Sequence, residues 1–236
     1  MMTGTPVDDS RYFQGIKACV FDAYGTIFDL ISATDRRSAE LGDQAGPLGD
    51  IWRSKQLQYT WLRSLTGHYT SFWQVTQDAL DYAMAQLGLD DPTLRDHLLA
   101  GYKELKAYDD VAPVLDRLQK AGMGTAILSN GSRDMLEPVV ENAGLSPWLD
   151  VVLSVEDSQI FKPDYRVYQQ ACDYFELPPE AICFLSSNGW DAAGAASFGF
   201  HVAWINRGDL PVDRLPGQPA AIIKSMSDLP ALLKLA

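Results

Sequence analysis

The segment ACVFDAYGT at residues 18–26 contains an apolar run that ends directly at the carboxylate of Asp22. A short apolar run bounded by a polar turn is typical of a strand buried on both faces of a parallel sheet. Similar apolar runs occupy residues 125–128, 151–153, 181–185, 201–205 and 221–223. We therefore predict a sheet that these six segments build.

Helical patterns lie between these runs from residue 109 onward. Apolar residues recur at helical spacing over 111–118, 135–140 and 167–175. Alternating strands and helices predict an α/β fold, a doubly wound parallel sheet of the Rossmann-like type with helices on both faces. Ligands of such sheets bind beyond the carboxyl ends of the strands, where the polar residues that end the runs should gather.

Residues 31–108 interrupt this alternation. Amphipathic helical patterns cover 51–65, 71–87 and 93–105, and the Gly-Pro-Leu-Gly segment at 46–49 is predicted to be a loop. An insert that follows the first strand can close over the carboxyl end of that strand. We therefore predict a core built from 1–30 and 109–236 and a helical cap built from 31–108.

Composition limits the possible partners and cofactors. The chain has 236 residues and a net charge of −12, which disfavours nucleic acid and anionic membranes, because phosphate binding needs clustered Lys and Arg. We expect a cytoplasmic protein, because no secretion signal or membrane-spanning apolar run is present. Cys19, Cys172 and Cys183 are predicted to be reduced core thiols. The three histidines are not paired at ligand spacing, so we expect no histidine-built metal site.

Asp22 and the turn that follows it are the first candidate site. Gly25 allows the backbone to approach a ligand, and the hydroxyl of Thr26 can donate to the carboxylate. A carboxylate so placed can act as a nucleophile. The alternative is that Asp22 only caps the turn.

Three further segments end strands or open helices. Ser129 and Asn130 follow the run at 125–128 and could seat an anion, although either residue could simply cap a helix. Lys162 precedes a helix that Asp164 could cap, and a lone lysine is usually solvated. Residues 186–191, SSNGWD, add two hydroxyls, an amide and a carboxylate. The order of these segments along the chain is more informative than any one of them.

In that order, with a helical insert after the first segment, nearly the whole chain resembles the haloacid dehalogenase superfamily and, more narrowly, the L-2-haloacid dehalogenases. The narrower resemblance is carried by residues 21–26, 52–63, 128–132, 161–164 and 186–191. It implies hydrolytic dehalogenation of short L-2-haloalkanoic acids to D-2-hydroxyalkanoic acids, with release of halide.

Phosphatases of the same superfamily differ at two places. They carry a second aspartate two residues after the nucleophile, where this chain has Tyr24. They bind Mg²⁺ through paired acids, where this chain has Ser186 and Ser187 before Asp191. The resemblance therefore implies a site without metal or cofactor. A phosphatase or phosphotransferase and a non-catalytic binding protein remain alternatives, whereas a serine hydrolase is disfavoured because no GxSxG elbow occurs.

The resemblance also implies roles for individual residues. Asp22 would attack C2 of the haloacid and form an ester that water cleaves, and Arg53 would receive the halide. Without the resemblance, Arg53 would be interpreted as a solvated residue on a packed helix. Ser129, the backbone near Asn130 and Lys162 would hold the substrate carboxylate, and Lys162 would keep Asp22 ionised.

The remaining implied roles concern water, the alkyl group and assembly. Asn188 and Asp191 would position water, supported by Ser186 and Ser187, and Tyr168 would orient Lys162. Substrate contacts are also expected from Tyr24 and Thr26, and an apolar wall from Leu57, Phe72 and Trp190. The family and the cap aromatics Trp61 and Trp73, predicted to be exposed, suggest a homodimer.

Overall fold

The computed structural model describes residues 13–30 and 41–235, and these form a six-stranded sheet of order β3-β2-β1-β4-β5-β6. The strands are β1 (Ala18–Phe21), β2 (Gly124–Ser129), β3 (Val151–Ser154), β4 (Ile182–Ser186), β5 (His201–Ile205) and β6 (Ala221–Ile223). All neighbouring strands are parallel, and Phe21 is in register with Ile127 of β2 and Leu185 of β4. The residues that follow β1, β2 and β4 therefore meet at one edge.

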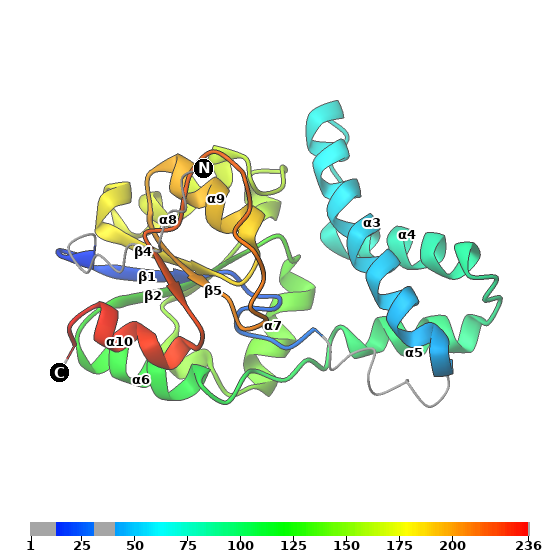
Figure 1. Ribbon diagram of the computed structural model, residues 1–236, viewed down its shortest axis with the longest axis horizontal. Coiled ribbons are helices and arrows are strands. Elements are labelled where there is room, and N and C mark those ends of the chain that lie inside the picture. The colour runs from blue at the N-terminus through cyan, green and yellow to red at the C-terminus, as the bar shows by residue number, and fades with distance from the viewer. Residues whose placement is uncertain (1–12, 31–40, 236) are drawn as a thin grey trace.

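Helices cover both faces of this sheet. Helices α8 (Tyr165–Phe175) and α9 (Gly189–Phe198) lie over one face, and α6 (Val111–Lys120) and α10 (Leu229–Leu232) lie over the other (Figure 1). Helix α7 (Arg133–Asn142) connects β2 to β3. The prediction of a doubly wound parallel sheet is confirmed. Short 3-10 helices occupy Gly42–Gln44, Ser146–Trp148, Val155–Asp157, Pro179–Ala181 and Met226–Asp228.

The inserted helices lie to one side of the core (Figure 1). They are α3 (Ala45–Thr66), α4 (Phe72–Gln86) and α5 (Pro92–Gly101), and together they form the predicted helical cap. The chain segments that lead into and out of the insert are hydrogen-bonded to each other. The Asp29 N–H donates to the Lys106 carbonyl and the Tyr108 N–H donates to the Ile27 carbonyl, both over 2.9 Å. The proposed boundaries at 30 and 108 flank this pairing and stay predictions, and part of the predicted cap, residues 31–40, lies outside the described residues.

Two predictions about the helices were wrong, and one helix was missed. The predicted loop at 46–49 is the first turn of α3. Pro47 is tolerated there because the first amides of a helix have no intrahelical acceptor, and Leu48 is buried. The predicted helix at 93–105 ends at Gly101. Helix α9 was not predicted, because its many alanines give little contrast between a buried and an exposed face.

Two expectations about cysteines and membranes can be compared with the described residues. Cys19, Cys172 and Cys183 are buried free thiols, as predicted. Among the helices in residues 13–30 and 41–235, none combines the length and apolarity that crossing a membrane requires.

Candidate active site at the carboxyl edge of the sheet

Asp22 lies directly after β1 and is buried, with 6% of its surface exposed. Its Oδ2 accepts hydrogen bonds from Thr26 Oγ1 at 3.1 Å and from Asn188 Nδ2 at 2.9 Å. Ser186 Oγ lies at 3.5 Å from the same oxygen. Oδ1 lies 3.2 Å from the Lys162 ammonium. The carboxylate therefore meets residues from the ends of β1 and β4 and from the segment before α8, and simple capping of its own turn does not account for these contacts.

The turn after Asp22 depends on a glycine. Gly25 has a φ of +83°, and a Cβ at that position would lie 3.0 Å from Ser187 Oγ. The Ser187 N–H donates to Thr26 Oγ1 over 2.8 Å, and the single hydroxyl proton of Thr26 can be donated to Asp22 Oδ2 at 3.1 Å or to Ser187 Oγ at 3.2 Å. This arrangement ties the turn after β1 to the turn after β4.

Lys162 joins two buried carboxylates. Its ammonium lies 2.9 Å from Asp191 Oδ2 in addition to the contact with Asp22, and only 1% of its side chain is exposed. Burial alone would lower the pKa of Lys162, but Asp191 and Asp22 outweigh burial and raise the pKa above its ordinary value. Lys162 is therefore a buried cation, not the solvated lysine that its sequence context alone would suggest.

Tyr168 and Asp191 lie behind Lys162. The Tyr168 hydroxyl donates to Asp191 Oδ1 over 2.8 Å, so both oxygens of Asp191 are occupied. Burial raises the pKa of Tyr168 well above its ordinary value, with Asp191 adding to the effect, so the phenol stays a donor. The predicted role of Tyr168 in orienting Lys162 stays a prediction, and its hydroxyl holds Asp191, the carboxylate that pairs with the Lys162 ammonium. Neither Tyr168 nor Asp191 lines the cavity beside Asp22, which argues against direct contact with substrate or water.

A small cavity lies between Asp22 and the cap. Its lining residues are Asp22, Tyr24, Arg53, Leu57, Phe72, Ser129, Asn130, Asn188 and Trp190, and all of them belong to the predicted site. Arg53 reaches across from the cap, and its Nη2 donates to Asn188 Oδ1 over 3.1 Å. The predicted residues Thr26, Lys162, Ser186 and Ser187 form a layer around Asp22 outside this lining.

Ser129 and Asn130 do not cap the following helix. The N-cap of α7 is Ser132, and it makes no side-chain capping hydrogen bond. Ser129 Oγ instead accepts from the Gly131 N–H over 3.0 Å, which leaves its own proton available to donate. The Asn130 side chain accepts from the Lys162 N–H over 3.0 Å. These contacts favour the anion seat over the helix cap.

The apolar wall brings cap and core into contact. The rings of Tyr24 and Phe72 stack with centroids 6.0 Å apart, and Trp61 meets Trp190 edge-on at 5.6 Å. The prediction that Trp61 and Trp73 are exposed was wrong, because both are half-buried. Lys103 Nζ lies 4.5 Å from the ring centroid of Trp73. Neither aromatic therefore supports the predicted dimer.

Gln56 was not among the predicted site residues, although it is fully buried and accepts from Arg53 Nη1 over 2.7 Å. A signal for it exists in the sequence. Gln56 follows Trp52 by four residues and precedes Thr60 by four, so the three share one helix face, and all three are buried.

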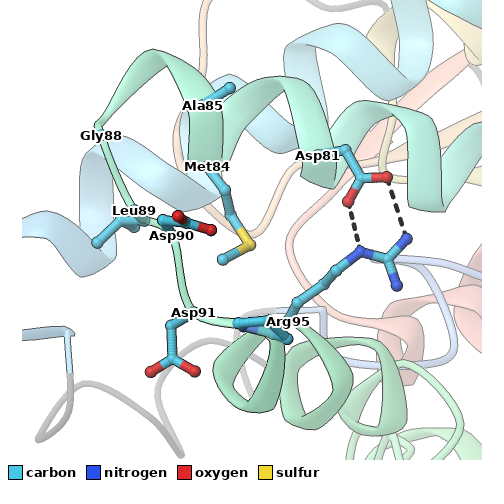
Figure 2. A pocket seen from close by; sticks show the side chains of 9 residues that line it. Asp81, Met84, Ala85, Gly88, Leu89, Asp90, Asp91 and Arg95 are labelled. Atoms are coloured by element: carbon cyan, nitrogen blue, oxygen red, sulfur yellow. Dashed lines mark hydrogen bonds and ion pairs between the residues drawn. The ribbon is translucent and has the colours of Figure 1, made fainter.

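A second, wider pocket lies in the cap at the junction of α4 and α5 (Figure 2). Across it, Arg95 Nη2 and Asp81 Oδ2 form an ion pair over 3.0 Å (Figure 2). Met84 and the backbone turn at Gly88 complete the wall. None of the residues around Asp22 lines this pocket, so it is separate from the cavity at the strand ends.

Comparison with known proteins gives consistent results. Residues 16–199 match the family described as haloacid dehalogenase-like hydrolase. The (S)-2-haloacid dehalogenase 1 of Pseudomonas sp. strain CBS-3 is 44% identical over 92% of this chain and 96% of its own length. A dehalogenase crystal structure superposes with a TM-score of 0.91 at 43% identity, over 93% of this chain and 98% of that one. The structure of the L-2-haloacid dehalogenase from Xanthobacter autotrophicus with chloropropionic acid covalently bound superposes with a TM-score of 0.85 at 36% identity, also over 93% of this chain and 98% of that one.

Proposed function

The chain belongs to the haloacid dehalogenase-like hydrolases and, within them, to the (S)-2-haloacid dehalogenases, and on that premise we propose that it converts short L-2-haloalkanoic acids to D-2-hydroxyalkanoic acids. It is a hydrolase of carbon–halide bonds. The observation that carries the proposal is the buried Asp22 carboxylate, which lines a small cavity opposite the cap residue Arg53.

In the first step, Asp22 displaces the halide. Each carboxylate oxygen has two lone-pair sites, and Oδ2 uses both for Thr26 and Asn188. Within residues 13–30 and 41–235, the donor to Oδ1 is Lys162 alone, so Oδ1 keeps one lone pair for attack. A bond forms between Oδ1 and C2 of the substrate, and the halide leaves with the electron pair of the broken bond. Arg53 supplies the positive charge that receives it.

The substrate carboxylate is held on the opposite side. Ser129 has a free hydroxyl proton, and the ammonium of Lys162 uses two of its three hydrogens for Asp22 and Asp191. Lys162 lies outside the cavity lining, so its positive charge would act on the bound carboxylate from the layer behind Asp22. Holding the carboxylate and the halide at two separate points orients C2 for in-line attack and selects one enantiomer.

In the second step, water attacks the carbonyl carbon of the ester, and the bond between that carbon and Oδ1 breaks. Oδ1 leaves as the hydroxyl oxygen of the product and takes one proton of the water, and the other proton is released as the Asp22 carboxylate is restored. Oδ2 becomes the carbonyl oxygen, and Thr26 and Asn188 already donate to it, so they stabilise the negative charge that develops there. Water does not touch C2 in this step. The single inversion at C2 therefore persists in the product, and an L substrate gives a D product.

Magnesium-dependent phosphatase chemistry is the competing function. Tyr24 replaces the acid that would protonate a leaving alcohol, and the cation between the two buried carboxylates is an ammonium. Among the described residues, no three His, Cys, Asp or Glu side chains gather as metal ligands. Our proposal is therefore metal-independent dehalogenation without a cofactor.

The test is halide release from each enantiomer of 2-chloropropionate in excess EDTA, beside the variant Asp22→Asn. We expect turnover of the (S) enantiomer alone, undiminished by EDTA and abolished in the variant. Equal turnover of both enantiomers would contradict the stereochemistry, and activity that returned only with Mg²⁺ would favour a phosphatase-like site. Binding without halide release would identify a non-catalytic protein.

The predicted homodimer remains a prediction that light scattering can measure.

A further inference from the structure

Gln56 stands at the centre of a buried hydrogen-bond network in the cap. Its Oε1 accepts from Arg53 Nη1 over 2.7 Å, and its Nε2 donates to Thr76 Oγ1 over 2.7 Å. The Thr76 hydroxyl donates in turn to the Phe72 carbonyl over 2.7 Å. Gln56 and Thr76 have no exposed surface. The network thereby joins helices α3 and α4 beside Arg53, whose guanidinium donates to Asn188.

The direction of every hydrogen bond in this network is determined. A hydroxyl has one proton, and that of Thr76 is used on the Phe72 carbonyl, so Thr76 can only accept from Gln56. The amide nitrogen of Gln56 must therefore face Thr76, and its oxygen must face Arg53. Tyr102 donates to that same oxygen over 3.3 Å and occupies its second lone pair.

This network fixes the plane of the Arg53 guanidinium. Nη1 is held by Gln56 within the cap, and Nη2 is held by Asn188 of the core. A guanidinium is rigid and planar, so two bonds at its two terminal nitrogens set the direction of the remaining N–H groups. Since Arg53 lines the cavity beside Asp22, those groups are available to an anion there.

We propose that Gln56 is a positioning residue for halide departure. Through Phe72, Thr76 and Gln56, the cap sets the guanidinium of Arg53 at the angle at which it meets the leaving halide. The inference rests on the proposed function, because it takes Arg53 as the halide-binding residue.

Comparing bromide with chloride as the leaving group distinguishes a positioning role of Gln56 from a purely structural one, because loss of stability would affect both substrates equally. The ester intermediate is the same whether chloride or bromide has left, so a halide-dependent effect on kcat/KM arises in the first step. Chloride is the poorer leaving group and depends more on stabilisation by Arg53. In Gln56→Met, kcat/KM for 2-chloropropionate should fall about tenfold, the loss expected from one hydrogen bond to a charged group. The ratio of bromide to chloride turnover should rise several-fold.

Thr76→Val keeps the shape of the side chain and removes the hydroxyl that orients Gln56. We expect a smaller rise of the same ratio. Thr60→Val is the matched control. Thr60 lies on α3 and is as buried as Thr76, but it donates to the Leu57 carbonyl, outside this network. It should leave the ratio unchanged, and thermal unfolding of each variant checks that it folds.

Arg53→Lys separates the inference from the function on which it rests. If Arg53→Lys raises the ratio and neither Gln56→Met nor Thr76→Val does, the positioning role is overturned while the halide role of Arg53 stands. If Arg53→Lys leaves the ratio unchanged, Arg53 does not stabilise the halide and the inference is overturned with the proposal.

Discussion

Lys162 and Asp191 form an ion pair inside the core, with 2.9 Å between Nζ and Oδ2 and 1% and 0% of their side chains exposed. A buried pair of this kind adds little net stability, because both charges lose their hydration. Removal of one partner is costly, however, because it leaves the other charge buried and uncompensated.

Lys162→Met should therefore destabilise the fold by about 3–5 kcal/mol in urea unfolding at neutral pH. Lys120→Met is the control, because the pair of Lys120 with Asp116 is exposed, and it should cost at most about 1 kcal/mol. A loss as small as that of the control would show that Asp22 and Asp191 do not need the ammonium.

The difference in unfolding free energy between the wild type and Lys162→Met should depend on pH. The folded-state pKa of Lys162 is raised, so its stabilisation is fully present below the ordinary lysine value of about 10.4 and is lost as the pH rises through the folded value. The gap in unfolding free energy between the wild type and Lys162→Met should stay constant from neutral pH to about 10 and narrow above it. If the gap widened at alkaline pH, the pKa of Lys162 would be lower in the folded state than in the unfolded state, which contradicts this account.

Tyr24→Phe should raise stability and lower activity. The Tyr24 hydroxyl is buried and has no hydrogen-bond partner within residues 13–30 and 41–235, and burial raises its pKa well above the ordinary value. Removal of an unsatisfied hydroxyl should stabilise the fold by about 1 kcal/mol. The neutral phenol lines the cavity and can donate to the bound anion, so kcat/KM should fall about tenfold. If kcat/KM is unchanged, the hydroxyl does not meet the substrate.

Two glycines of α9 should respond differently to alanine. A Cβ on Gly194 would lie 2.6 Å from Pro163 Cβ and 2.7 Å from Tyr168 Oη, so Gly194→Ala should push Tyr168 away from Asp191. We expect a loss of about 1–3 kcal/mol from overpacking, together with reduced turnover. On Gly189 the Cβ would meet only the flexible side chain of Asp213, so Gly189→Ala should be tolerated. Unfolding curves of equal midpoint for the two variants would contradict this difference.

Thr26→Val should slow the second step more than the first. The Thr26 hydroxyl donates to Asp22 Oδ2, the oxygen assigned as the ester carbonyl, and loss of one such donor costs about 10²–10³ in rate. The variant should release a burst of halide and accumulate the ester, which mass spectrometry of the intact chain detects. Slow turnover without a burst would place Thr26 in the first step instead.

The sequence allowed the sheet and the strand-end residues to be predicted, because each apolar run ends at a polar residue and parallel strands align their ends. It could not show that Lys162 is buried, because the partners that bury it are 140 and 29 positions away, at Asp22 and Asp191. The same limit explains Tyr168, whose hydroxyl donates to Asp191, 23 positions away, so that its link to Lys162 passes through that carboxylate. Gln56 was missed because a glutamine on an amphipathic helix usually faces solvent.

The aspartyl-ester route requires that an oxygen of Asp22 passes to the product and is replaced from water. A single turnover of (S)-2-chloropropionate by excess enzyme in ¹⁸O-labelled water tests it directly. Mass spectrometry should find the label in the peptide that contains Asp22 and none in the 2-hydroxypropionate. Label in the hydroxy acid, with an unlabelled Asp22 peptide, would mean that water attacks C2 itself and that no aspartyl ester forms.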